Sequence, residues 1–231
     1  MTKKYSLIPA LDHPDLARVD KLIAAVGRHP AISAFKVGFT LGLSYGLPKV
    51  VETIRRHSDK TIIYDHQKAG TDIPATGELF ARTMREAEID TAILFPQAGP
   101  ETLEAWVRAL IDSGRGVLVG GAMTHPAYLR SEGGYLCDEG VVDIYRRARD
   151  LGVKGFVMPL TKPAVARRLF DLAGLGRESE LYSPGFGAQG GVADEFDFVL
   201  SHHLIVGRAL LAAPDPGHWL NQTMASLGGG Q

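Results

Sequence analysis

Residues 91–122 have the sequence TAILFPQAGPETLEAWVRALIDSGRGVLVGGA, in which two short apolar runs flank a stretch with helical spacing of apolar residues. The runs TAILF and GVLVGGA have the length of buried β-strands. Between them, ETLEAWVRALIDSG places apolar residues at positions i, i+3, i+4 and i+7, as one face of an α-helix requires. A strand, helix, strand pattern of this kind is typical of parallel β/α units.

The same alternation extends in both directions from this unit. Apolar runs of strand length occupy residues 6–11, 32–38, 61–65, 91–95, 116–122, 155–159, 181–185 and 203–207. Helical spacing lies between several of them, at 15–28, 101–114, 141–152 and 162–174. Eight such units predict an α/β protein, a (β/α)8 TIM barrel in a single domain over residues 1–227. Residues 228–231 are the expected flexible C-terminal tail, and an open doubly wound sheet is the alternative architecture.

The charge balance and cysteine content narrow the class of partner. The 231 residues include 25 basic and 26 acidic side chains, so no general attraction to nucleic acid or to an anionic membrane is expected. Cys137 is the one cysteine, which excludes an intramolecular disulfide. Without an apolar run of about 18 residues or a signal-peptide pattern, we expect a cytoplasmic protein whose partners are small molecules or other subunits.

Polar residues directly after the apolar runs are the candidate site residues, because the active site of such a barrel lies at the C-terminal ends of its strands. They are Asp12 after the first run, Lys36 late in the second, Asp65, Lys68 and Asp72 at and after the third, and Thr124 and His125 after the fifth. Lys36 and Lys68 would keep neighbouring carboxylates ionised, so the array can set a negative group and an acid against a substrate anion. A solvated loop with weak surface ion pairs is the alternative for residues 64–77, YDHQKAGTDIPATG.

Two segments near the C-terminus predict a phosphate site. Residues 183–191, SPGFGAQGG, are rich in glycine, and residues 205–211, IVGRALL, carry an arginine. The loops after strands seven and eight form the usual phosphate site of these barrels. Arg208 would bind the phosphate as a bidentate cation and Gln189 as an uncharged donor. Pro184, Gly187, Gly190 and Gly207 complete the expected substrate-binding set.

With these segments placed, the chain resembles the orotidine 5′-monophosphate decarboxylase family over nearly its whole length, and its archaeal-type members in particular. The resemblance lies in Asp12 of LDH, Lys36 of FKVG, Asp65, Lys68, Asp72-Ile73-Pro74-x-Thr76, MTHP, PLTKP, SPGFGAQGG and VGRA, all in the family order. It implies decarboxylation of orotidine 5′-monophosphate to UMP, the last step of de novo pyrimidine nucleotide synthesis. It also implies direct loss of carbon dioxide, with no cofactor and no metal.

The resemblance further implies a role for each site residue. Asp65 would face the substrate carboxylate, Lys68 would protonate C6 of the pyrimidine, and Lys36 would hold the array. Asp12 would bind the ribose, Thr124 the pyrimidine ring, and Gln189 and Arg208 the phosphate. Asp72 and Thr76 would reach across a dimer interface, which implies a homodimer with shared active sites.

Two departures from the family pattern bear on the activity. The central loop has the spacing D-x-x-K-x-x-x-D instead of D-x-K-x-x-D, and Phe95 stands where a histidine is expected at the end of strand four. The alternatives are therefore a magnesium-dependent sugar-phosphate lyase of the same suprafamily and a non-catalytic protein that binds nucleotide phosphates. Residues 124–140, THPAYLRSEGGYLCDEG, are the expected lid over the ligand.

Overall fold

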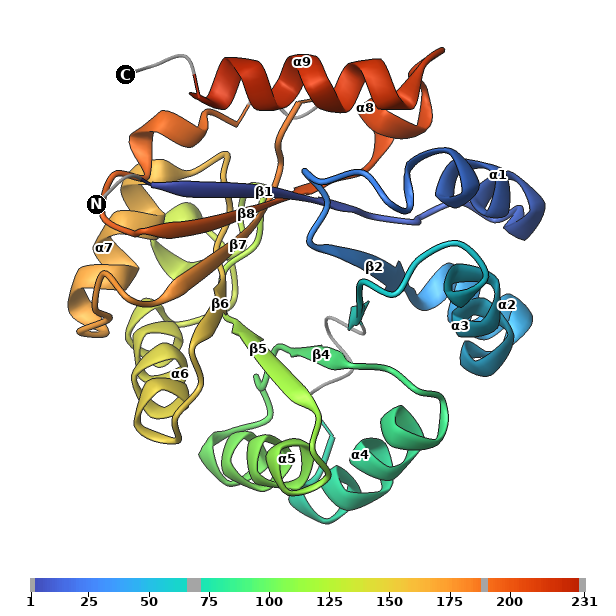
Figure 1. The fold of residues 1–231 in the computed structure, drawn as a ribbon. Coiled ribbons are helices and arrows are strands. Elements are labelled where there is room, and N and C mark those ends of the chain that lie inside the picture. Colours follow the sequence, from blue (N-terminus) through green and yellow to red (C-terminus); the bar gives the residue numbers. More distant parts are fainter. Residues whose placement is uncertain (1–2, 66–71, 188–190, 229–231) are drawn as a thin grey trace.

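The computed structural model describes residues 3–65, 72–187 and 191–228, and they form a barrel of parallel strands inside a ring of helices (Figure 1). The eight strands have the order β1-β8-β7-β6-β5-β4-β3-β2. Isolated parallel bridges, Leu7 to Ile32 and Ala10 to Lys36, join the first and second strands at the ends of this order. The sheet is therefore nearly closed, which confirms the (β/α)8 TIM barrel and excludes the open sheet.

All eight predicted runs are strands. They are β1 (Lys4–Pro9), β2 (Ala34–Gly38), β3 (Thr61–Asp65), β4 (Thr91–Leu94), β5 (Gly116–Gly120), β6 (Gly155–Val157), β7 (Glu180–Pro184) and β8 (Ser201–Val206). The expected end of β5 at residue 122 was wrong. The amides of Gly121 and Ala122 donate to the Tyr145 hydroxyl at 2.9 and 3.2 Å, so they bond to this side chain from α6 instead of continuing the β5–β6 ladder.

The helices connect the strands and cover the outside of the barrel (Figure 1). They are α1 (Leu16–Val26), α2 (Phe39–Tyr45), α3 (Leu47–Arg55), α4 (Gly77–Glu86), α5 (Pro100–Asp112), α6 (Asp138–Asp150), α7 (Pro163–Leu172), α8 (Arg208–Leu211) and α9 (Pro216–Gly228), with short 3-10 turns η2 (Pro74–Thr76), η3 (Arg130–Glu132) and η4 (Ala193–Glu195). None of the helices in the described ranges is long and apolar enough to cross a membrane.

Two expected boundaries change with these helices. Gly228, which we expected in the tail, is the last residue of α9. The expected lid 124–140 is too long at its end, because α6 begins at Asp138. The Asp138 carboxylate accepts hydrogen bonds from the amide and hydroxyl of Ser131, which fixes the first turn of the helix there. The loop between β5 and α6 thus ends at residue 137.

Alternation along the strands separates two cores, because successive side chains of a strand point to opposite faces. One set fills the inside of the barrel and includes Ile8, Ala34, Ile63, Ile93 and Leu118. The larger set packs between strands and helices. Lys36 stands two residues after Ala34, and Asp65 two residues after Ile63, so both share the inward face near the C-terminal ends of their strands.

Candidate active site

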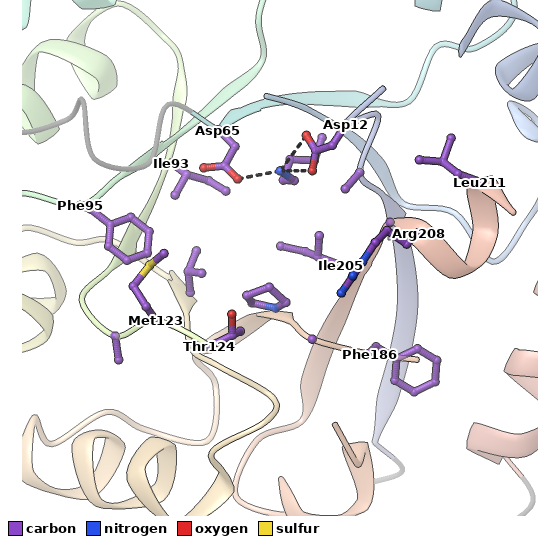
Figure 2. Close-up of a pocket in the computed structure, with 17 residues that line it drawn as sticks. Asp12, Asp65, Ile93, Phe95, Met123, Thr124, Phe186, Ile205, Arg208 and Leu211 are labelled. Atoms are coloured by element: carbon purple, nitrogen blue, oxygen red, sulfur yellow. Dashed lines mark hydrogen bonds and ion pairs between the residues drawn. The ribbon is translucent and has the colours of Figure 1, made fainter. Parts of the chain in front are cut away.

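A cavity of about 290 Å³ opens at the C-terminal ends of the strands (Figure 2). Seven of the predicted site residues line it, namely Asp12, Lys36, Asp65, Thr124, Pro184, Gly207 and Arg208. They come from strands or loops that are far apart in the sequence and adjacent in the barrel. The fold therefore brings most of the predicted site together.

A lysine between two carboxylates forms one wall of the cavity. Lys36 Nζ donates to Asp65 Oδ2 at 2.7 Å and to Asp12 Oδ2 at 3.2 Å. Lys36 and Asp65 are buried, whereas half of the Asp12 side chain is exposed. Gly38 makes room for this arrangement, since a Cβ at that position would lie 2.6 Å from Asp12 Oδ1.

The charges of this cluster keep its lysine protonated. Burial lowers the pKa of Lys36, but the charges of Asp65 and Asp12 and their hydrogen bonds outweigh burial and hold that pKa above its ordinary value. Lys36 is therefore an ammonium at neutral pH. An anionic group of a ligand placed against Asp65 would meet the negative charge of that carboxylate.

A second side of the cavity carries a cation. Arg208 is exposed, lines the cavity, and forms no ion pair with any residue that the structure describes. Pro184, Gly185 and Phe186 lie beside it at the end of β7. A guanidinium that faces a cavity without a carboxylate partner is suited to bind a phosphate.

The third side of the cavity is apolar, and this side was not predicted as part of the site. Ile93, Phe95 and Met123 lie together across the cavity from Arg208 (Figure 2). Phe95, expected as the last residue of strand four, follows β4 directly and is buried. Its ring packs on Gly120, where a Cβ would collide with it. From the sequence, Phe95 was noted only as a departure from the family pattern, but the period of two places it on the same face as the inward-facing Ile93, two residues earlier.

Two predicted residues lie away from the cavity of their own chain. Asp72 is exposed, and its Oδ1 accepts a hydrogen bond from the Ile73 amide at 2.7 Å. The Thr76 hydroxyl donates to the Ile73 carbonyl. Trp106 Nε1 also donates to that carbonyl, so this segment is fastened to α5. Neither Asp72 nor Thr76 lines the cavity.

The remaining predicted residues fall into two groups. Lys68, Gln189 and Gly190 lie outside the described residues. Gly187 is exposed, with a φ of +77° that favours glycine, and it is not among the residues that line the cavity. Within residues 3–65, 72–187 and 191–228, no group of three or more His, Cys, Asp or Glu side chains is placed to hold a metal ion.

Fold and cavity define the class of protein: a (β/α)8 barrel whose charged residues meet at the C-terminal ends of the strands, where enzymes of this fold bind their substrates. The chain belongs to the orotidine 5′-phosphate decarboxylase / HUMPS family, whose model matches residues 5–222.

Individual relatives agree with this assignment. The orotidine 5′-phosphate decarboxylase of Methanosarcina barkeri is 32% identical over 216 residues, covering 94% of this chain and 91% of the relative. That of Pyrococcus abyssi is 32% identical over 213 residues, covering 91% and 93%. The crystal structure of orotidine 5′-monophosphate decarboxylase from Methanocaldococcus jannaschii, complexed with inhibitor BMP, superposes with a TM-score of 0.82. It is 26% identical and covers 96% of this chain and 98% of its own.

Proposed function

We propose that this protein decarboxylates orotidine 5′-monophosphate to UMP, without a cofactor. The observation that carries the proposal is the polarised cavity, with Arg208 on one side and the Lys36 cluster on another. Such a cavity would bind a phosphate at the Arg208 end and set the carboxylate of the substrate ring against Asp65 at the other end, where the two negative charges repel. The relatives named orotidine 5′-phosphate decarboxylase support the same substrate.

The cavity suggests how the nucleotide lies. Arg208 binds the phosphate, together with Gly187, Gln189 and Gly190 of the loop after β7. Asp12, half-exposed beside Lys36, accepts hydrogen bonds from the ribose hydroxyls. Thr124 and the apolar wall of Phe95 and Met123 contact the pyrimidine ring. Pro184 and Gly207 line the path between ring and phosphate.

Asp65 promotes the loss of carbon dioxide by facing the substrate carboxylate. Two like unit charges about 4 Å apart near a protein surface repel each other by about 4 kcal/mol. This repulsion between Asp65 and the substrate carboxylate is relieved when that carboxylate leaves as neutral carbon dioxide. The bond between C6 and the carboxylate breaks, and its electron pair remains on C6. Lys68 then delivers a proton from Nζ to that carbon, while its charge stabilises the carbanion. Lys36 donates hydrogen bonds to Asp65 and Asp12 and holds both carboxylates in place.

The proposed assembly is a homodimer in which each chain completes the site of its partner. Phe39, Leu43 and Ile73 are exposed by 64%, 78% and 60%, and they follow β2 and β3 at the end of the barrel that holds the cavity. Exposed apolar side chains of this size mark a contact surface when they lie together. Asp72 and Thr76 are near Ile73 and away from their own cavity, as residues that serve a partner would be. We place this single-domain enzyme in the cytoplasm.

The decisive experiment is incubation of the purified protein with orotidine 5′-monophosphate without added metal, followed by ultraviolet absorbance. We expect turnover that EDTA does not reduce, and loss of turnover in Lys68→Ala with UMP binding retained. Turnover of a sugar phosphate that requires Mg²⁺ would identify the lyase alternative. UMP binding with no turnover would identify a non-catalytic binder.

The shared site has its own test. Mixed Lys68→Ala and Asp72→Ala chains should recover part of the activity, because one of the two sites in a heterodimer contains both residues. Failure to recover, with heterodimers present by mass spectrometry, would contradict the shared site.

A further inference from the structure

A lysine outside the cavity holds the loop that carries Thr124. Lys162, in the connection between β6 and α7, donates through Nζ to the His125 carbonyl at 2.6 Å. The same ammonium lies 2.8 Å from Glu132 Oε2 and 2.7 Å from Oε1. Glu132 belongs to the same loop as His125. The Lys162 side chain therefore attaches the loop 124–137 at two residues to the connection between β6 and α7.

Neighbouring bonds extend this attachment. The Thr161 hydroxyl donates to the Thr124 carbonyl at 3.3 Å, so consecutive residues after β6 hold consecutive carbonyls after β5. Glu132 Oε2 also accepts from the amides of Tyr128 and Leu129, each at 3.3 Å. The start of the loop, at Thr124 and His125, and its middle, at Glu132, are thereby attached to Thr161 and Lys162.

The ion pair is shielded from solvent. The Lys162 and Glu132 side chains are only 16% and 19% exposed. Burial raises the pKa of Glu132, but the hydrogen bonds from Lys162 and the two amides outweigh this and leave the pKa below its usual value. Removing Lys162 would take this donor from the His125 carbonyl and leave the Glu132 carboxylate with the two amides alone, whereas a fully exposed pair would lose little.

We propose that Lys162 is a positioning residue, which fixes Thr124 at the ring end of the cavity by clamping residues 124–137 to the connection after β6. Lys162 does not line the cavity, and Thr124 does, so the effect passes through the loop. A displacement of about 1 Å at a contact residue can cost about 100-fold in rate. The kinetic test of this inference rests on the proposed function. The second test measures proteolysis and does not depend on that function.

The chain offers a matched control at the other end of the barrel. Arg55 donates to the Lys60 carbonyl and to Asp90 Oδ2, both at 2.6 Å. The Arg55 side chain is 30% exposed and the Asp90 side chain 38%. Like Lys162, it joins a carbonyl and a carboxylate, but Lys60 and Asp90 directly precede β3 and β4. Arg55→Met therefore removes a similar set of bonds far from Thr124.

The kinetic test compares Lys162→Met, Lys162→Arg and Arg55→Met. We expect Lys162→Met to lower kcat/KM for orotidine 5′-monophosphate by about 10- to 100-fold, mainly through KM, because a contact with the ring acts in substrate and transition state alike. Lys162→Arg should restore most of the loss, and Arg55→Met should stay within twofold of wild type. The effects of Thr124→Ala and Lys162→Met should be less than additive, since both act through one side chain. Full additivity, or an equal loss in Arg55→Met, would overturn the proposal.

The second test needs no turnover. Trypsin should cut at the exposed Arg130 faster in Lys162→Met than in wild type or Arg55→Met, with cleavage sites identified by mass spectrometry. Equal cleavage rates would refute the clamp. If wild type fails to turn over orotidine 5′-monophosphate but the cleavage difference is present, the proposed function fails and the clamp stands.

Discussion

Each end of the barrel contains a cavity, and the two cavities have the same volume but differ in how their charged side chains are paired. A cavity of about 290 Å³ opens at the C-terminal ends of the strands, and another of about 290 Å³ opens among their first residues. At the C-terminal end, Asp12 and Asp65 share Lys36, and Arg208 lines another side of the cavity and forms no ion pair with the residues that the structure describes. At the N-terminal end, polar side chains bond mainly to one another. The two cavities therefore differ in the arrangement of their charged side chains and not in their volume, and this arrangement identifies the C-terminal cavity as the candidate site.

The N-terminal network lies at the seam where the sheet closes. Ser6 Oγ of β1 lies 2.7 Å from Ser33 Oγ, just before β2, and 2.6 Å from His203 Nδ1 of β8. The Tyr182 hydroxyl donates to Glu180 at 3.0 Å, and the ring of Tyr182 stacks on His203. The bond between Ser6 and Ser33 joins β1 to the residue before β2, where only isolated bridges connect the two strands. We interpret this end as a stabilising device.

The largest effect is expected from Lys36→Met at the C-terminal end. Loss of one partner from a buried ion pair costs about 3 to 5 kcal/mol, and 4 kcal/mol at the transition state corresponds to about 1,000-fold in rate. We therefore expect turnover of orotidine 5′-monophosphate to fall by about 1,000-fold or more. Lys60→Met is the control, because Lys60 donates to the Ile32 carbonyl at the other end of the barrel. Activity within tenfold of wild type in a folded Lys36→Met chain would contradict the role of the cluster.

Arg208→Ala tests the other charged side of the cavity. Hydrogen bonds to a charged group contribute about 1.5 to 3 kcal/mol, so KM should rise by about 10- to 100-fold. Arg208→Lys should recover only part, since an ammonium cannot bind phosphate in bidentate fashion. Steady-state kinetics give both values, with Arg177→Ala as an exposed control before β7. An unchanged KM would place the phosphate elsewhere.

Ser6→Ala should alter stability and leave the chemistry alone. It removes the bridge between Ser33 and His203, and leaving such partly buried groups without a partner costs about 2 kcal/mol. For a chain of this length the melting temperature should fall by about 4 to 8 °C. Calorimetry and kcat/KM on the same sample provide the comparison. A loss of kcat/KM without a loss of stability would mean that the N-terminal end takes part in function.

The sequence predicted the fold and four charged residues that line the cavity, Asp12, Lys36, Asp65 and Arg208. Each buried strand carries an apolar run, and residues such as Asp12, Lys36 and Asp65 stand at the C-terminal ends of these runs, where a barrel brings them together. No exact distance was needed, since closure of the sheet makes these positions adjacent.

The remaining features depend on contacts between distant segments. The pairing of Phe95 with Gly120 requires that β4 and β5 be placed side by side in a particular register. The bond from Lys162 to Glu132 joins two connections that no local pattern relates. The early end of β5 depends on a tyrosine from α6. Such contacts are tertiary, so neither periodicity nor spacing reports them.

The smallest effect is expected from pH, again at the N-terminal end. His202 is fully buried, and its Nε2 lies 2.8 Å from Ser183 Oγ. Burial holds the pKa of His202 well below its usual value of 6.5, and the charges of Lys3 and His203 act in the same direction. The unfolded chain thus binds a proton near pH 6.5 that the folded chain does not. Stability contributed by neutral His202 is complete above that pH and declines below it.

Between pH 7.5 and 6.0 this linkage should lower the free energy of unfolding by about 1 kcal/mol. His202→Gln, which keeps a polar partner for Ser183, should remove that slope, while His218→Gln at an exposed position should preserve it. Urea unfolding at the two pH values measures the difference for all three chains. If His202→Gln retains the wild-type slope, another group takes up the proton. Ser6→Ala would then be the one remaining test of the N-terminal end as a purely structural region.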